Sequence, residues 1–144
     1  MTPLKRVYAA FLSKILEDEW QQWTMEEIET DLIEILDAAI VRFKFPRSSL
    51  EHDEENFFDN LETIEIQIIA SYMKCEWLNR NIMTWENVKP LYEERDFSQA
   101  NLLDKLISAL ESERMNALQL ESIYYRSVNG KPFKYRKLAG HNNE

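Results

Sequence analysis

Glycine and proline are scarce in this chain, and their scarcity limits the folds open to it more than any other feature. The 144 residues include two glycines and four prolines, well below the averages of about 7% and 5%. Hairpin turns and the loops of β-sandwiches need glycine, Asn-Gly or proline in quantity. A chain of this length, which is enough for one domain, is therefore predicted to be all-α: an antiparallel bundle of about four helices.

Apolar residues recur at helical spacing in four stretches. These stretches predict helices over about residues 3–18, 24–43, 61–82 and 98–125. The second helix has the clearest start, because Thr24 and Glu27 form a capping box, and it must end before Pro46. Residues 83–97 leave two alternatives open: a short helix capped by Thr84, or continuation of the third helix as far as Pro90.

The apolar stripe of the fourth helix is interrupted at Glu113-Arg114, which we interpret as ordinary surface charges. We expect the last turns of this helix to leave the body and carry the C-terminal tail outward. The preceding connection, residues 44–60, is long and has aromatic residues at both ends. Loops of this length are usually functional or mobile. Because of its aromatic ends, we expect the connection to be pinned at both sides and to project between them.

Among the tryptophans, Trp77 has the spacing of a core residue, and the lone Cys75 beside it is predicted to be a small buried hydrophobe. Trp20, Trp23 and Trp85 lie at helix ends, where a partner surface is an alternative to the core.

No catalytic constellation can be recognised. The sequence has no glycine-rich phosphate loop, no Ser or Cys nucleophile with a plausible His partner, and no carboxylate pair in an apolar setting. His52 lies in an acidic run, Glu51–Glu55, which we interpret as a solvated loop and not as a metal site. No apolar stretch is long enough to cross a bilayer. We therefore expect a non-enzymatic, soluble protein that is made in the cytoplasm and has no cofactor.

The last nineteen residues, 126–144, differ in kind from the rest of the chain. They hold both glycines and five basic residues against one acid, a formal charge of +4, whereas residues 1–125 hold 12 bases and 25 acids, a formal charge of −13. A basic, aromatic segment on an acidic body is typical of an arm that docks onto another molecule. A frayed, solubilising terminus is the alternative from composition alone.

Most of the chain resembles the small all-helical head–tail adaptor (connector or neck) proteins of tailed bacteriophages. The resemblance rests on the order of an Ile-rich helix, IEIQIIASYMKCEWLNRNI, a polar connection, and DFSQANLLDKLISALESERMNALQLESIYYRS, preceded by FKFPRSSL. It is one of helix order and texture, without a diagnostic motif. The connection Trp85–Asp96 departs from the expected pattern, because it contains Pro90 and lacks a Gly/Ser-rich turn.

The resemblance implies a structural virion protein that forms a ring, typically of twelve subunits, beneath the portal. Such a ring extends the DNA channel, through which DNA passes without specific binding, and joins the capsid to the next neck or tail component. The arm would grip the portal through Lys131, Pro132, Phe133, Lys134, Tyr135, Arg136, Lys137 and Leu138. The candidate subunit-interface residues are Trp20, Trp23, Phe45, Phe57, Phe58 and Trp85.

Two other functions remain open from the sequence. The first is a small acidic helical regulator that binds a single basic protein in a 1:1 complex. The second is direct nucleic-acid binding by the tail, which should be weak because the tail has only five basic residues.

Overall fold

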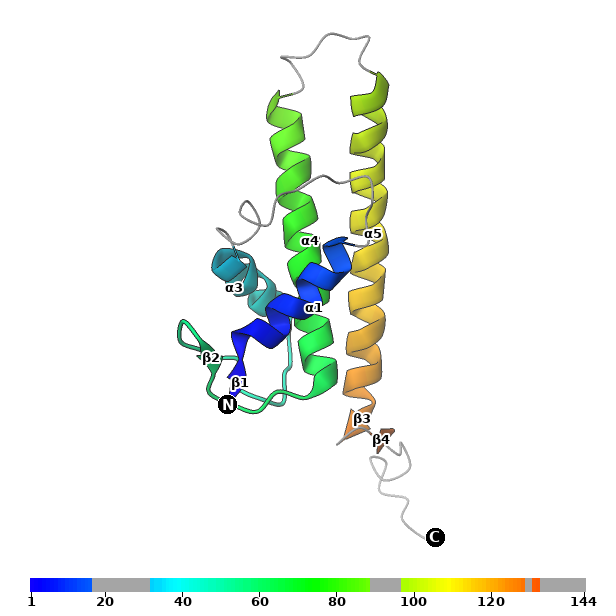
Figure 1. The fold of residues 1–144 in the computed structure, drawn as a ribbon. Helices are drawn as coiled ribbons and strands as arrows, with labels where there is room; N and C mark the ends of the chain where they lie inside the picture. The colour runs from blue at the N-terminus through cyan, green and yellow to red at the C-terminus, as the bar shows by residue number, and fades with distance from the viewer. Residues whose placement is uncertain (17–31, 89–96, 129–130, 133–144) are drawn as a thin grey trace.

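The body of the protein is built around two long antiparallel helices. A computed structural model of the chain describes residues 1–16, 32–88, 97–128 and 131–132. Helix α4 (Thr63–Val88) and helix α5 (Phe97–Tyr125) lie side by side, and α1 (Leu4–Leu16) and α3 (Leu32–Arg42) pack against one half of α4 (Figure 1). The predicted all-α bundle is confirmed.

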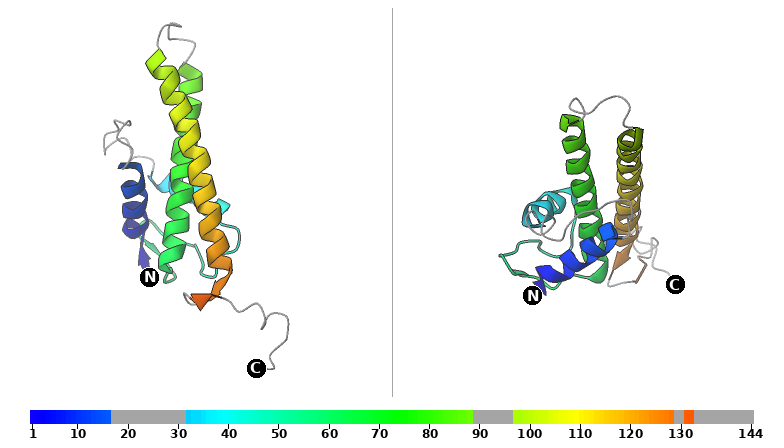
Figure 2. Two further views of the ribbon diagram at one scale, coloured as in Figure 1. Left: turned by 90° about the vertical axis from the view of Figure 1, so that its right-hand side faces the viewer. Right: turned by 45° about the horizontal axis from the view of Figure 1, so that its top comes forward.

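Helix α4 occupies the centre of the bundle. It contacts α1, α3 and α5, which surround it when the molecule is turned (Figure 2). From Ile64 to Asn81 every residue is buried or half-buried, because apolar side chains cover most of the circumference of this helix. Cys75 and Trp77 lie in the core, as predicted. Burial raises the pKa of the Cys75 thiol to about 11.

The C-terminal end of α4 decides between the two alternatives that the sequence left open. Helix α4 continues to Val88, which is the second of the two alternatives for this region. The Thr84 hydroxyl donates to the carbonyl oxygen of Arg80, 2.9 Å away and one turn earlier, and so Thr84 lies inside the helix instead of capping a new one. The predicted capping box at Thr24 and Glu27 lies outside the described residues.

The connection between α3 and α4 is tied to the N-terminus of the chain. Strand β1 (Thr2–Pro3) pairs antiparallel with β2 (Asn56–Phe57). The Thr2 hydroxyl donates to the carbonyl oxygen of Asp59 at 3.0 Å and accepts from the backbone N–H of Leu61 at 2.8 Å. These contacts fix the start of α1 against the start of α4.

The turn before β2 is held by an aspartate. The Asp53 carboxylate accepts hydrogen bonds from the backbone N–H groups of Asn56 and Glu55, both at 2.7 Å. These two hydrogen bonds hold the pKa of Asp53 below its usual value, the one from Asn56 having the larger effect.

Two sequence predictions about α5 are wrong. Glu113 is a buried residue, and its carboxylate lies 3.5 Å from the Lys14 ammonium of α1 and 3.9 Å from the Lys74 ammonium of α4. The two lysines offset the cost of burying its charge, so the buried face of α5 passes through Glu113 without interruption. The last turns do not leave the body, because Ala117 and Tyr124 are fully buried.

Candidate functional site

The arm begins as a short hairpin directly below α5. Strand β3 (Ser127–Val128) pairs antiparallel with β4 (Lys131–Pro132), so two of the predicted portal-binding residues, Lys131 and Pro132, lie in β4. The remaining six lie outside the described residues: Phe133, Lys134, Tyr135, Arg136, Lys137 and Leu138. The part of the arm that the structure describes is therefore its base, and the contacts that hold this base define the candidate site.

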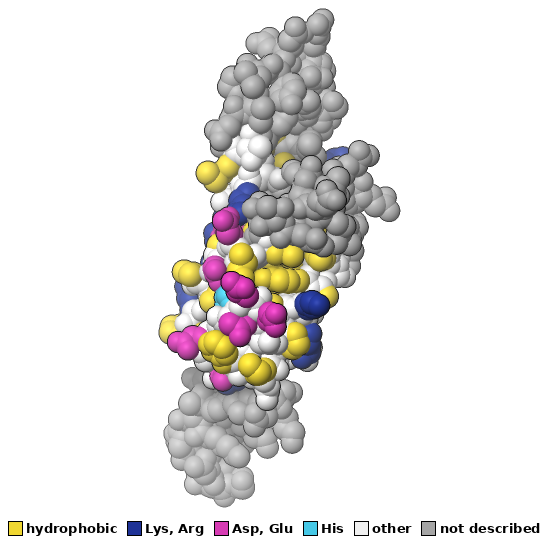
Figure 3. Space-filling view, turned by 60° about the vertical axis from the view of Figure 1, so that its left-hand side comes forward, with side chains coloured by type: hydrophobic (Ala, Val, Ile, Leu, Met, Phe, Trp, Pro, Cys, Tyr) yellow, Lys and Arg dark blue, Asp and Glu magenta, His cyan; other side chains and the backbone are white. Residues whose placement is uncertain are grey.

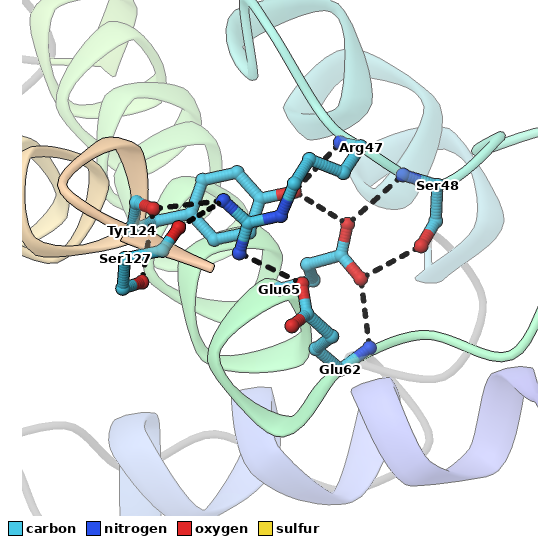
Figure 4. Close-up of polar contacts among 6 residues, drawn as sticks. All are labelled: Arg47, Ser48, Glu62, Glu65, Tyr124 and Ser127. Atoms are coloured by element: carbon cyan, nitrogen blue, oxygen red, sulfur yellow. Dashed lines mark hydrogen bonds and ion pairs between the residues drawn. The ribbon is translucent and has the colours of Figure 1, made fainter. Parts of the chain in front are cut away.

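Arg47 ties the base of the arm to the body (Figure 4). Its Nη1 donates to the backbone carbonyl oxygens of Tyr124 at 2.9 Å and Ser127 at 2.8 Å. Its Nη2 donates to the Glu62 carboxylate at 2.9 Å, and the guanidinium carbon lies 3.8 Å from the centre of the Tyr124 ring. One side chain thus caps the Tyr124 carbonyl in the last turn of α5, where a positive charge is favourable, and links it and β3 to the start of α4.

A fully buried carboxylate, Glu65, lies behind Arg47 in the first turn of α4. Its two oxygens accept hydrogen bonds from the Tyr124 hydroxyl at 2.8 Å, the Glu62 backbone N–H at 2.7 Å, and the Ser48 hydroxyl and backbone N–H at 2.9 and 3.3 Å. A buried charge is tolerated when hydrogen bonds replace its hydration. We call the six residues drawn in Figure 4 the arm junction: Arg47, Ser48, Glu62, Glu65, Tyr124 and Ser127.

Burial raises the pKa of Tyr124 to about 12, and its hydrogen bond to the Glu65 carboxylate acts in the same direction. The neighbouring Tyr125 has its pKa raised to about 12, again by burial first and then by its 2.6 Å hydrogen bond to Glu121. Tyr72 of α4 donates to the other oxygen of Glu121. Both tyrosines at the end of α5 therefore keep their protons, and act as donors, throughout the neutral pH range.

The three predicted interface phenylalanines divide into two kinds. Phe45 and Phe58 are exposed, at 72% and 51% of their surface. Phe57 has no exposed surface, because it pairs with Thr2 in the small sheet and packs into the core, so it is a core residue and its assignment to the interface is corrected. Trp20 and Trp23 lie outside the described residues, and Trp85 lies in α4 with a side chain that the structure does not describe.

His52 is not a freely solvated loop residue. Its Nε2 lies 2.7 Å from the Asp37 carboxylate of α3, its Nδ1 lies 2.7 Å from the carbonyl oxygen of Asp53, and its ring contacts Phe57. His52 therefore joins the connection to α3. Within the described ranges, no group of three or more His, Cys, Asp or Glu side chains is arranged to hold a metal ion. In the same ranges, no helix is both long and apolar enough to cross a bilayer.

Sequence reasoning missed the arm junction, although one local signal was present. Glu62 and Glu65 are three residues apart at the start of a helix, and Glu65 reaches back to the backbone N–H of Glu62 as the glutamate of a capping box does. Nothing local indicates Arg47, which bonds Ser127 across 80 residues of sequence. Comparison with protein families, curated proteins and solved structures finds no match to this chain.

Proposed function

We propose that this chain is a non-enzymatic assembly protein, a head–tail adaptor of the kind that its helix order resembles. In this role the helical body forms a ring under the portal of a tailed phage, the arm grips the portal, and the ring presents its other end to the next neck or tail component. DNA passes through the ring without specific binding, and no cofactor takes part.

The observation that carries this proposal is the arm junction. A segment that docks onto a partner binds more tightly when its base is already positioned, because less conformational freedom is lost on binding. Arg47 holds the carbonyl of Ser127, the first residue of β3, and Glu65 holds Tyr124 at the end of α5. The exit of the arm is thereby fixed to both long helices, which suits a docking arm better than a frayed end.

The buried carboxylates support a structural role. Among the described residues, the buried carboxylates are Glu65, Glu113 and Glu121, and each makes a hydrogen bond or an ion pair within the chain. Catalytic acids and bases are instead placed within hydrogen-bond reach of a substrate. These three glutamates connect elements of the bundle to one another.

The test combines the chain with the portal of the same virion and examines the mixture by electron microscopy and native mass spectrometry. We expect a ring of the chain on the portal. Removing residues 128–144 should abolish attachment without changing the helical content measured by circular dichroism. A matched truncation of residues 139–144, which keeps the predicted anchors, should still attach. If the chain without residues 128–144 attaches as well as the full chain, the arm does not make the contact. If the full chain forms no ring on the portal, the adaptor function is wrong.

The alternative is a small acidic regulator that binds one basic protein. The observation in its favour is a group of exposed carboxylates, one on α3 and four in the connection that follows it: Asp37, Glu51, Asp53, Glu54 and Glu55. This function predicts a 1:1 complex with a basic protein and no ring, which native mass spectrometry separates directly from the adaptor.

A further inference from the structure

The C-terminal half of α5 carries a row of exposed apolar side chains. Met115, Leu118 and Tyr125 follow one another at spacings of three and seven residues, which places them on one side of the helix. They are exposed at 59%, 56% and 40% of their surface. Phe45, exposed at 72%, extends the row because its ring packs edge-on against Tyr125 with 6.1 Å between ring centroids.

Positive charge accompanies this row. Between residues 112 and 127 the exposed charged side chains are Arg114 and Arg126, because the two glutamates of this stretch, Glu113 and Glu121, are buried; one exposed acid, Glu111, lies a turn before Met115. We call the apolar row and its two arginines the α5 flank. Its members are Phe45, Arg114, Met115, Leu118, Tyr125 and Arg126.

A second mixed surface has the opposite charge. Ile33, Asp37 and Val41 lie four residues apart on the exposed side of α3, and Val41 is exposed at 82%. Four exposed carboxylates of the following connection adjoin Asp37, since His52 joins the two segments. Figure 3 shows acidic side chains gathered around this histidine with apolar side chains beside them. We call this surface the α3 flank: Ile33, Asp37, Val41, Glu51, Asp53, Glu54 and Glu55.

The two flanks lie on different sides of the molecule. Helices α3 and α5 both pack on α4, and α4 lies between them (Figures 1 and 2). Both flanks belong to the half of the body that also holds α1 (Figure 1). Two unlike, complementary surfaces on different sides of one subunit are what a heterologous contact requires, and repetition of such a contact closes a ring when the rotation allows it.

We propose that the α5 flank of one copy packs against the α3 flank of the next copy. The occupant of both surfaces is thus a second copy of this chain, because both flanks expose apolar side chains and their charges are opposite in sign. The contact rests on the proposed ring and names the residues that form it. Exposed Val41 and Leu118 become buried at its centre, and Arg114 and Arg126 meet the carboxylates of residues 51–55.

Chemical cross-linking of introduced cysteines tests the contact in the full chain. Val41→Cys and Leu118→Cys both change exposed side chains, so the fold should be kept, which circular dichroism verifies. The native Cys75 is buried and its pKa is raised to about 11, so it should not react with a maleimide, and the unaltered chain is the control. A bismaleimide is added across a series of protein concentrations, and the products are separated by mass.

The double variant should give a ladder of dimer, trimer and higher species, because each copy offers both halves of the contact. An equal mixture of the two single variants should stop at dimers, and each single variant alone should stay monomeric. Dimers from Leu118→Cys alone would mean that two α5 flanks face each other and would overturn the proposal. A monomeric double variant at every concentration would overturn it as well.

Charge reversal provides a second measurement. Adding Arg114→Glu to the double variant should slow formation of the ladder about tenfold or more, because like charges then face each other. Lys105→Glu makes the same change at an exposed site higher on α5 and should leave the rate unchanged. Equal rates for the two would contradict the charge match. If the chain forms the cross-linked ladder but binds no portal, the proposed interface stands and the adaptor function is wrong. If the chain attaches to the portal but forms no ladder, only the proposed interface is wrong.

Discussion

Carboxylates occur in two contrasting settings in this protein, the arm junction and the α3 flank. In the junction, Glu65 is fully buried and accepts four hydrogen bonds from three residues. On the α3 flank, Glu51, Glu54 and Glu55 are exposed. The difference teaches that the setting of an acid decides what it can contribute: the junction carboxylate holds segments together, whereas these three flank carboxylates remain exposed to solvent.

Replacing Glu65 by alanine should have the largest effect. The change leaves the Tyr124 hydroxyl and the donors of Ser48 and Glu62 without their acceptor inside the protein. We expect the free energy of unfolding to fall by about 3 to 5 kcal/mol, because several donors lose their acceptor at once and each buried donor left unpaired costs about 1 to 3 kcal/mol. Denaturant titration measures it. Glu55→Ala on the flank should change the free energy of unfolding by about 0.5 kcal/mol or less. Equal losses for Glu65→Ala and Glu55→Ala would mean that the two settings do not differ in their contribution to stability.

Tyr124→Phe should have the next largest effect. It keeps the ring that packs on Phe43 and under Arg47 but removes the hydroxyl that donates to Glu65 and accepts from the Arg47 backbone N–H at 2.6 Å. We expect a loss of about 1 to 3 kcal/mol. Tyr125→Phe, at a more exposed position, is the matched control and should cost less. A larger loss of stability from Tyr125→Phe than from Tyr124→Phe would mean that the Tyr124 hydroxyl is not the main contact holding the base of the arm.

Alkaline pH should weaken the junction in a defined range. Tyr124 and Tyr125 keep their protons in the folded state up to a pKa of about 12, whereas an unfolded tyrosine ionises near its ordinary pKa of about 10. The stability that this difference contributes is complete below pH 10 and is lost as the pH rises toward about 12. Denaturant titrations at successive pH values should show the decline, and Tyr124→Phe should make it shallower. A flat profile up to pH 12 would contradict the burial of these hydroxyls.

The smallest effect is expected on the flank. Asp37→Ala removes the contact with His52, but the Asp37 side chain is 61% exposed, and exposed ion pairs contribute little. We expect Asp37→Ala to change the free energy of unfolding by about 0.5 kcal/mol or less, as measured by thermal or denaturant unfolding. Asp53→Ala is the comparison, because it removes the carboxylate that accepts from two backbone N–H groups. A large loss of stability from Asp37→Ala would mean that the flank contributes to the stability of the fold as the junction does.

The sequence was sufficient to predict the helices that the structure describes and the core positions of Cys75 and Trp77, because apolar spacing is a local signal. It failed where burial depends on a distant partner. Glu113 looks like a surface charge until Lys14 and Lys74 are placed beside it, and Phe57 looks like an exposed loop aromatic until β1 pairs with β2. For the candidate site, the sequence indicated the basic arm but not its anchorage, since Arg47 reaches Tyr124 and Ser127 only in the folded chain.

The position of Arg47 also determines how the body resists mechanical force. A pull on the arm acts first on Ser127, whose carbonyl is held by the Arg47 guanidinium. The same guanidinium is bonded to Glu62, and the backbone of Arg47 is bonded to the Tyr124 hydroxyl. Tension is thus shared between α5, the start of α4 and the connection before it, and unravelling α5 from its end requires these bonds to break together.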